Sequence, residues 1–146
     1  MPSTEASVVD IWTSPIRDRI AAINDFVEAG YEVHVNFAPV IYYQDWLADY
    51  QQLFEEIDDT LLPPAKEQLQ AEVILLTHND RLHEVNLGWH PQAKGLLWQP
   101  NLQETKLSQT GGKNVRYKRG LKGTLVDGLC GALEQQLPYC TIRYAF

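Results

Sequence analysis

Apolar and polar positions alternate along this chain with two different periods, and the change of period divides it into helices and strands. Apolar residues recur every three or four positions over 15–29 and 44–61, which predicts two amphipathic helices. Residues 31–37 alternate strictly, as a half-buried strand does, whereas 72–77 form a short continuous apolar run typical of a strand covered on both faces. The first half of the chain therefore reads as helix, strand, helix, strand.

The second half has weaker patterns, and its longest stretch without a clear period runs from Gln99 to Asn114. Within that stretch Gly111-Gly112 indicates a turn. The elements that we predict here are a helix capped by Asn79 or Asp80, a short helix from Pro91, a short strand at 115–119, a helix at 124–137 and an alternating strand at 140–146.

Proline and glycine set most of the predicted boundaries. Ser14 is expected to cap the first helix, with Pro15 at its first position and Gly30 as its stop. Ala38-Pro39 is expected to end the strand that precedes it, because proline has no N–H to donate to a ladder. Pro63-Pro64 is expected to break the second helix.

Strands that alternate with helices predict a parallel sheet with right-handed crossovers. Three clear strands make about half a barrel, so the expected fold is α/β, a partial barrel of parallel strands and crossover helices. The expected organisation is a polar N-terminal lead over 1–13, whose first ten residues are the one part expected to lack fixed structure, and the half-barrel over 14–146. A sheet this small leaves its edge strands bare, which indicates a partner chain or a missing N-terminal half.

The composition narrows the class of protein. The chain has 146 residues, 45% of them hydrophobic, which suits one domain with a real core. No stretch reaches the ~20 apolar residues of a membrane span, and the polar first residues do not form a signal peptide, so we expect a cytoplasmic protein. Cys130 and Cys140 are expected to be plain buried thiols, and we expect no metal site.

Charge is distributed unevenly. The net charge is −7, yet residues 105–126 contain six of the twelve basic residues and no acid. This basic segment is either a solvated surface loop or a patch that meets a phosphate backbone. Charge alone leaves both interpretations open.

Candidate chemistry lies where the predicted strands end, since barrel enzymes place their sites there. One such end is Phe37-Ala38-Pro39 and another is Thr77-His78-Asn79. His78 is either a ligand contact or a satisfied core histidine, and both remain open. His34 and Asn36 share one face of their strand, and the pattern favours an ordinary exterior face.

A series of short segments occurs in a fixed order along the chain: 29–33, 37–42, Trp46, 50–54, 73–79, Arg116-Tyr117-Lys118 with Gly120 and Gly123, and 142–146. Together they resemble the spore photoproduct lyases, which belong to the radical S-adenosylmethionine enzymes. The segments from 29 to 54 are similar to an "AGYPV…AP(I/V)…GW…Y..LF" pattern of that family.

The resemblance implies a radical enzyme that uses S-adenosylmethionine and a four-iron four-sulfur cluster, and whose family role is the repair of a thymine dimer in DNA. It implies cofactor contacts at Ala38 and His78. It also implies DNA contacts at Arg116, Tyr117 and Lys118, and we add Lys122 as a further contact from its place past Gly120.

Two departures limit what the resemblance implies. The chain has no CxxxCxxC, and three cysteine thiolates must hold the cluster, so we expect the ligands on a missing N-terminal half or partner chain. Leu121-Lys122 stand where the family has an Arg-Tyr that contacts the lesion, which puts the substrate in question. We expect no catalytic residue in this chain and no activity from it alone. The alternatives are a cluster-free nucleic-acid-binding module and an inactive gene remnant.

Overall fold

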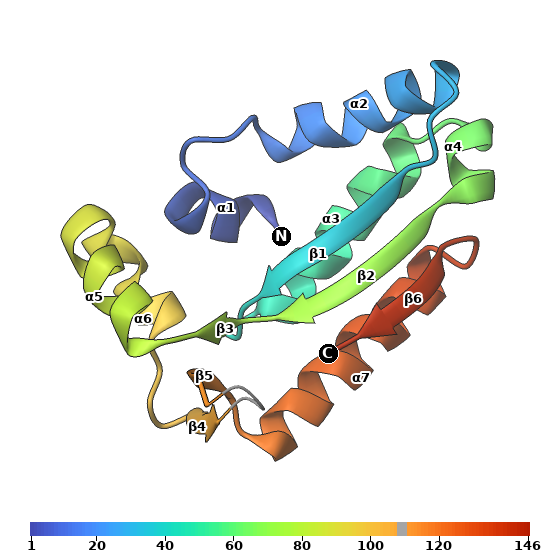
Figure 1. Cartoon of the computed structure of the whole chain (residues 1–146). Helices are drawn as coiled ribbons and strands as arrows, with labels where there is room; N and C mark the ends of the chain where they lie inside the picture. Colours follow the sequence, from blue (N-terminus) through green and yellow to red (C-terminus); the bar gives the residue numbers. More distant parts are fainter. Residues whose placement is uncertain (108–110) are drawn as a thin grey trace.

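The computed structural model describes residues 1–107 and 111–146, in two layers and a projecting hairpin (Figure 1). The elements are α1 (Ser3–Val9), α2 (Ile16–Glu28), β1 (His34–Val40), α3 (Trp46–Thr60), α4 (Pro63–Gln68), β2 (Gln70–Leu75), β3 (Thr77–His78), α5 (Asp80–Trp89), η1 (Pro91–Ala93), α6 (Lys94–Leu97), β4 (Gln103–Leu107), β5 (Lys113–Tyr117), α7 (Arg119–Gln136) and β6 (Thr141–Ala145).

The main sheet has the order β1-β2-β6, and both of its pairings are parallel. Helices α3 and α7 pack against each other behind this sheet, and its other face is open in Figure 1. The strand residues that point to the helices are apolar and buried, among them Phe37 and Val73, and they meet Phe54 and Leu129 in one core. A parallel sheet with helices along one face confirms the expected α/β half-barrel.

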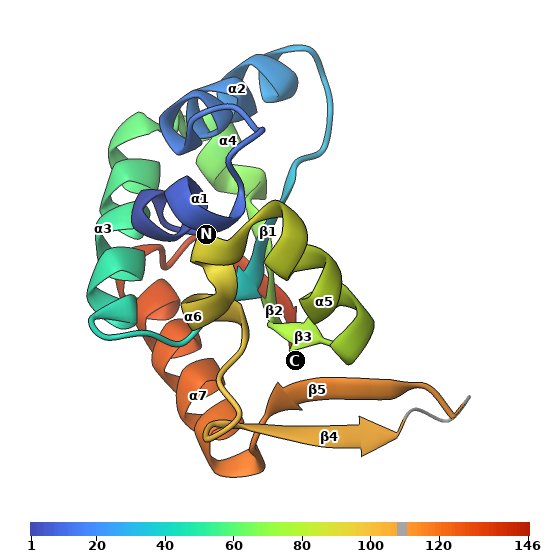
Figure 2. The ribbon, with the colours of Figure 1, turned by 90° about the vertical axis from the view of Figure 1, so that its left-hand side faces the viewer.

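A second, antiparallel sheet of order β3-β5-β4 was not predicted. It continues the line of β2 through the two-residue strand β3, and β4 and β5 form a hairpin that projects from the body (Figure 2). Residues 99–107 show no clear period because only one face of β4 is covered and its outer end is exposed on both sides. Part of the predicted Gln99–Asn114 stretch, residues 108–110, lies outside the described residues.

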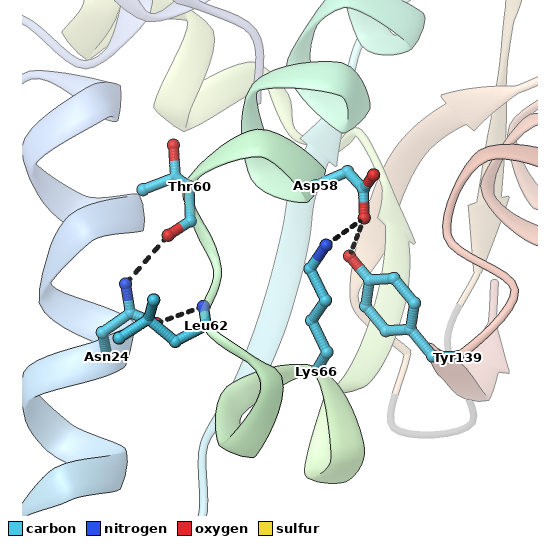
Figure 3. A network of polar contacts seen from close by, with 6 residues as sticks. All are labelled: Asn24, Asp58, Thr60, Leu62, Lys66 and Tyr139. Carbon is cyan, nitrogen blue, oxygen red and sulfur yellow. Dashed lines mark hydrogen bonds and ion pairs between the residues drawn. The ribbon is translucent and has the colours of Figure 1, made fainter.

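Polar contacts hold the ends of three helices together (Figure 3). The amide of Asn24 on α2 donates to the carbonyl of Thr60 at 3.0 Å and accepts from the N–H of Leu62 at 2.9 Å. Asp58 on α3 accepts from the ammonium of Lys66 at 2.6 Å and from the hydroxyl of Tyr139 at 2.8 Å, and these bonds lower the pKa of its carboxyl. The two networks tie α2 and the Tyr139 turn to the junction of α3 and α4.

Most long helices were predicted, and Gly30 is confirmed as the stop after α2, with a φ of 86° that favours glycine. Ser14 is not the cap that we expected, because α2 begins at Ile16 with no side-chain cap. Pro63-Pro64 does not merely break a helix; it opens α4, where proline suits the first positions. Helix α7 begins five residues before the predicted start.

Two predictions for the first forty residues were wrong. Ala38-Pro39 does not end β1, which continues to Val40; its pairing with β2 shifts register between Phe37 and Val40, so Pro39 needs no ladder bond there. The first ten residues are not without structure, because they contain α1, whose Glu5 and Ala6 are buried. The predicted boundary between a polar lead over 1–13 and a half-barrel over 14–146 stays a prediction.

Candidate functional site

The carboxyl ends of β1 and β2 bring the predicted site residues toward one region. Ala38 lies near the end of β1, half-buried, and its peptide bond to Pro39 is cis. Two residues after Ala38, the carbonyl of Val40 accepts a hydrogen bond from the N–H of Leu76 at 3.0 Å. The end of β1 is therefore fixed to the short link that leads from β2 to His78.

His78 lies where the main sheet passes into the hairpin sheet. It is only 5% exposed and pairs with Val115 on β5, while its neighbour Thr77 pairs with Arg116. The structure thus places His78 beside the basic segment, although 38 positions separate His78 from Arg116 in the sequence.

The environment of His78 keeps its imidazole neutral. Burial, and to a smaller extent the neighbouring His83, lowers the pKa of His78 below its ordinary value of 6.5. Among the described residues, its Nε2 has no hydrogen-bond partner. A buried ring nitrogen without a partner is unusual in a merely structural histidine, so His78 keeps one polar atom for a ligand or a water molecule.

Two aromatic residues that sequence reasoning missed complete this corner. His83 stacks on Trp98 with ring centroids 4.0 Å apart, and His78 makes a T-shaped contact with each of the two rings. Trp98 and Val115 also line a hollow of about 190 Å³, together with the carboxylate residues Asp80 and Glu104. Asn79 caps α5, as predicted: its side chain accepts a hydrogen bond from the N–H of Leu82 at 2.9 Å. Helix α5 therefore begins directly after His78 and brings His83 back against the His78 ring.

The hairpin presents the basic segment. Lys106 on β4 and Lys113 on β5 are exposed, and Arg116 is half-buried. Arg116 donates to the carboxylate of Glu104, directly opposite on β4, at 3.1 Å. Sequence reasoning missed Glu104. Two short segments on either side of the Gly111-Gly112 turn could have been read as the arms of a hairpin, and pairing them sets Glu104 opposite Arg116.

Tyr117 differs from the other hairpin candidates because it is 2% exposed. Its hydroxyl accepts a hydrogen bond from the N–H of Tyr42 at 2.8 Å, and burial raises its pKa to about 12. Lys118 follows as the residue before α7, and its ammonium donates to the carbonyl of Asn101 at 2.7 Å. Lys122, one turn into α7, is half-buried. Tyr117 thus fixes the base of the hairpin to the chain after β1, and Lys118 joins the two arms of the hairpin at their base.

The open face of the main sheet carries a polar cluster. His34 and Asn36 lie on this face, and both are exposed. Arg143 on β6 contacts Nδ1 of His34 at 2.8 Å and the carboxylate of Glu72 at 3.3 Å. In a barrel the face away from the helices is the inner one, which explains polar residues there.

Cys130 and Cys140 do not fit an iron–sulfur cluster. Cys130 lies within α7 and Cys140 just before β6, both as free thiols, and burial raises the pKa of each, to about 11 for Cys140. Cluster ligands are thiolates, which a raised pKa disfavours. In residues 1–107 and 111–146, no group of three or more His, Cys, Asp or Glu side chains is arranged to hold a metal ion.

No helix of the described chain is long and apolar enough to cross a membrane.

The fold is thus an α/β half-barrel whose candidate residues lie at the carboxyl ends of its parallel strands, where barrel folds commonly place their sites. The family model described as spore photoproduct lyase matches residues 6–146, and the chain belongs to that family.

Solved structures of spore photoproduct lyase have the same fold. One, complexed with dinucleoside spore photoproduct, and another, a mutant with bound AdoMet and dinucleoside spore photoproduct, each share 23% sequence identity with this chain at a TM-score of 0.84. Each match covers 92% of this chain but only 39% of the solved lyase chain. A comparison with curated proteins gives no match.

Proposed function

We propose that this chain is the C-terminal portion of a spore photoproduct lyase-like radical S-adenosylmethionine enzyme, and that it positions damaged DNA rather than performing the radical chemistry. The observation that carries the proposal is the pairing of β3 with β5, which sets His78 beside the hairpin that bears Arg116, in a chain of the lyase family. A cytoplasmic location goes with this proposal.

In this proposal Ala38 and His78 contact the cofactor. Bound there, S-adenosylmethionine would supply the radical chemistry of this enzyme class. The cluster does not belong to this chain, because Cys130 and Cys140 do not suit it. His78 is suited to donate or accept one hydrogen bond through Nε2, since its imidazole is neutral and that atom has no partner among the described residues.

The hairpin contacts the phosphate backbone in this proposal. Arg116, Lys118 and Lys122 lie along its base, and Lys106 and Lys113 extend the positive charge outward. Tyr117 has a supporting role, since its buried hydroxyl holds the hairpin against the chain that follows β1. Leu121 cannot replace a residue that stacks on or hydrogen-bonds a base, so the lesion that is bound remains to be measured.

The test is binding of this 146-residue chain to labelled duplex oligonucleotides with and without a spore photoproduct, followed by fluorescence anisotropy. We expect binding at low salt that weakens steeply as salt is raised, because phosphate contacts release counterions. Preference for the damaged duplex supports a lesion-facing role. Absence of binding to either duplex at low salt would overturn the proposal.

A further inference from the structure

Helix α1 buries a carboxyl group against α3 without a hydrogen bond. Glu5 is 1% exposed, and neither of its carboxylate oxygens has a partner among the described residues. Tyr50 on α3 is fully buried, and its hydroxyl has no partner there either. Burial, and after it the nearby carboxyl of Glu5, raises the pKa of Tyr50, so the two groups lie close enough to interact. The docked α1 therefore leaves one polar group unsatisfied on each side of its contact with α3.

Few apolar contacts compensate for these two unsatisfied groups. Of the seven residues of α1 only Glu5 and Ala6 are buried, and the helix packs chiefly against α3 and η1 (Figure 2). A helix of this length does not persist in water without tertiary contacts. A buried polar group that lacks a hydrogen bond opposes docking, because it would regain water on release. The docking of α1 is therefore weak enough for one change of charge to reverse it.

The charged and titratable groups around Glu5 come from α3, the link before α3, β5 and the chain before α1. They are Asp49, Tyr50, Tyr43, Tyr117 and the amino group of Met1. The remaining neighbour, η1, has no ionisable side chain. Burial is the largest influence on Glu5, exceeds the opposing effect of the Met1 ammonium, and raises the pKa of Glu5 from 4.5 to about 8. Glu5 thus ionises far more readily when α1 is undocked.

We infer that α1 is a latch beside the candidate site, docked while Glu5 is protonated and released when Glu5 ionises. Helix α1 packs against η1, which leads through α6 to Trp98, and the Trp98 ring contacts His78. Release of α1 therefore loosens the segment that carries Trp98. The family model begins at residue 6, so Glu5 is not among the residues that it matches. The inference goes beyond the proposed function and does not depend on DNA binding.

The expected pH dependence follows from the raised pKa of Glu5. Docking is strongest below about pH 4.5, where Glu5 is protonated in both states. As pH rises from there to about 8, the undocked state loses its proton first, and the docking equilibrium constant falls by about tenfold per pH unit. Above about pH 8 Glu5 is ionised in both states, and docking changes no further.

The test is backbone hydrogen exchange of the full chain, measured by pulse labelling and mass spectrometry at pH 6 and pH 8 and corrected for the intrinsic rate at each pH. Residues 6–10 report on α1, where the N–H groups of Ala6 and Asp10 are hydrogen-bonded, and residues 91–98 report on the segment beside it. We expect protection of 6–10 to fall at least tenfold from pH 6 to pH 8, and protection of 91–98 to fall with it. At both pH values 6–10 should exchange at least tenfold faster than β2, because α1 opens locally.

Three variants separate the charge of Glu5 from its shape. Glu5→Gln cannot ionise, so protection of 6–10 should be independent of pH and at least tenfold higher than in the original chain at pH 8. Tyr50→Phe removes the other unsatisfied group and should raise this protection at both pH values without changing its dependence on pH. The matched control is Glu28→Gln, an exposed carboxylate at the end of α2, which should keep the pH dependence of the original chain.

Far-ultraviolet circular dichroism establishes that each variant folds; if Glu5→Gln does not, the original chain and Tyr50→Phe decide. The inference is overturned if protection of 6–10 is the same at pH 6 and pH 8, or if Glu5→Gln keeps the pH dependence. It is also overturned if 91–98 do not follow α1, because α1 would then not act on the candidate site. Equal exchange of 6–10 and β2 would mean that α1 opens only when the whole chain unfolds, which overturns it as well. No DNA is present in this experiment, so its result is separate from the test of the proposed function.

Discussion

The hydroxyl of Tyr117 accepts a hydrogen bond from the backbone N–H of Tyr42, which joins the base of the hairpin to the chain after β1. Both ends of this bond come from segments near the candidate site, 75 positions apart in the sequence. The bond therefore sets how the hairpin lies relative to Ala38 and His78.

Replacing Tyr117 with phenylalanine should destabilise the chain by about 1–3 kcal/mol, because the change leaves the N–H of Tyr42 without its acceptor. Urea denaturation followed by tryptophan fluorescence measures the free energy of unfolding. The control is Tyr31→Phe, which removes the hydroxyl of an exposed ring and should change stability by less than about 0.5 kcal/mol. Equal effects of the two variants would contradict the role given to Tyr117.

Glu5 on α1 should make stability fall as pH rises. It is buried, and neither carboxylate oxygen has a partner within the described residues, so burial raises its pKa from 4.5 to about 8. The folded chain holds the proton more tightly than the unfolded chain, so the stabilising effect of protonation is complete below about pH 4.5 and is lost as pH rises to about 8. Glu5→Gln should remove this dependence and be the more stable form at pH 8.5, by about 1–3 kcal/mol.

The measurement for Glu5 is the free energy of unfolding of both proteins from pH 5 to pH 8.5. Glu56→Gln is the control, because Glu56 lies only half-buried on α3. Parallel pH profiles for the original chain and Glu5→Gln would show that α1 does not bury a neutral carboxyl.

His78 should produce the opposite trend in acid. Its pKa is lowered in the folded chain, so the unfolded chain binds protons first, and folding becomes less favourable as pH falls from about 6.5 toward the folded pKa. His78→Gln, which stays neutral, should lose less stability than the original chain between pH 7.5 and pH 5. The difference between the two unfolding free energies isolates His78 from the other three histidines. A constant difference across this range would refute the burial of a neutral imidazole.

The sequence was enough to predict the parallel half-barrel, because the hydrophobic period changes clearly between its helices and strands. Gly30 also marks the end of α2 clearly. It was not enough for the hairpin sheet. Residues 103–107 have one face covered and one exposed end, so they show no regular alternation. Glu72, the first residue of the predicted apolar run, shows the same limit. Its ion pair with Arg143 lies at a register shift between β2 and β6 that no local pattern encodes.

The candidate site was predicted in its parts but not in its assembly. His78 and Arg116 were identified separately, by a strand end and by a charge run, and the pairing of β3 with β5 places them together. The contact of Trp98 and His83 with His78 was missed, because an isolated Trp or His in a short helical region is far more often a packing residue. Tyr117, for which the resemblance implies a DNA contact, is only 2% exposed, and no local pattern of the short strand indicates that burial.

The cations at the base of the hairpin give the sharpest test of nucleic-acid binding. Arg116 and Lys118 already bind Glu104 and the carbonyl of Asn101, respectively, so each has a fixed position and retains other N–H donors for a phosphate. We expect the double variant Arg116→Ala, Lys118→Ala to bind damaged and undamaged duplexes more weakly by a similar factor. Each lost phosphate contact should also reduce the slope of log K against log salt by about 0.9.

The control is Arg17→Ala, an exposed cation on α2, a helix that lies far from the hairpin in Figure 1. It changes the net charge without removing a proposed contact, so a nonspecific effect of charge would appear in both proteins. Folding is checked by thermal unfolding, because loss of the Arg116–Glu104 pair, which is partly solvent-exposed, should cost less than about 1 kcal/mol. If a folded double variant keeps both the affinity and the salt slope of the original chain, the basic segment is a solvated surface and the hairpin does not contact DNA.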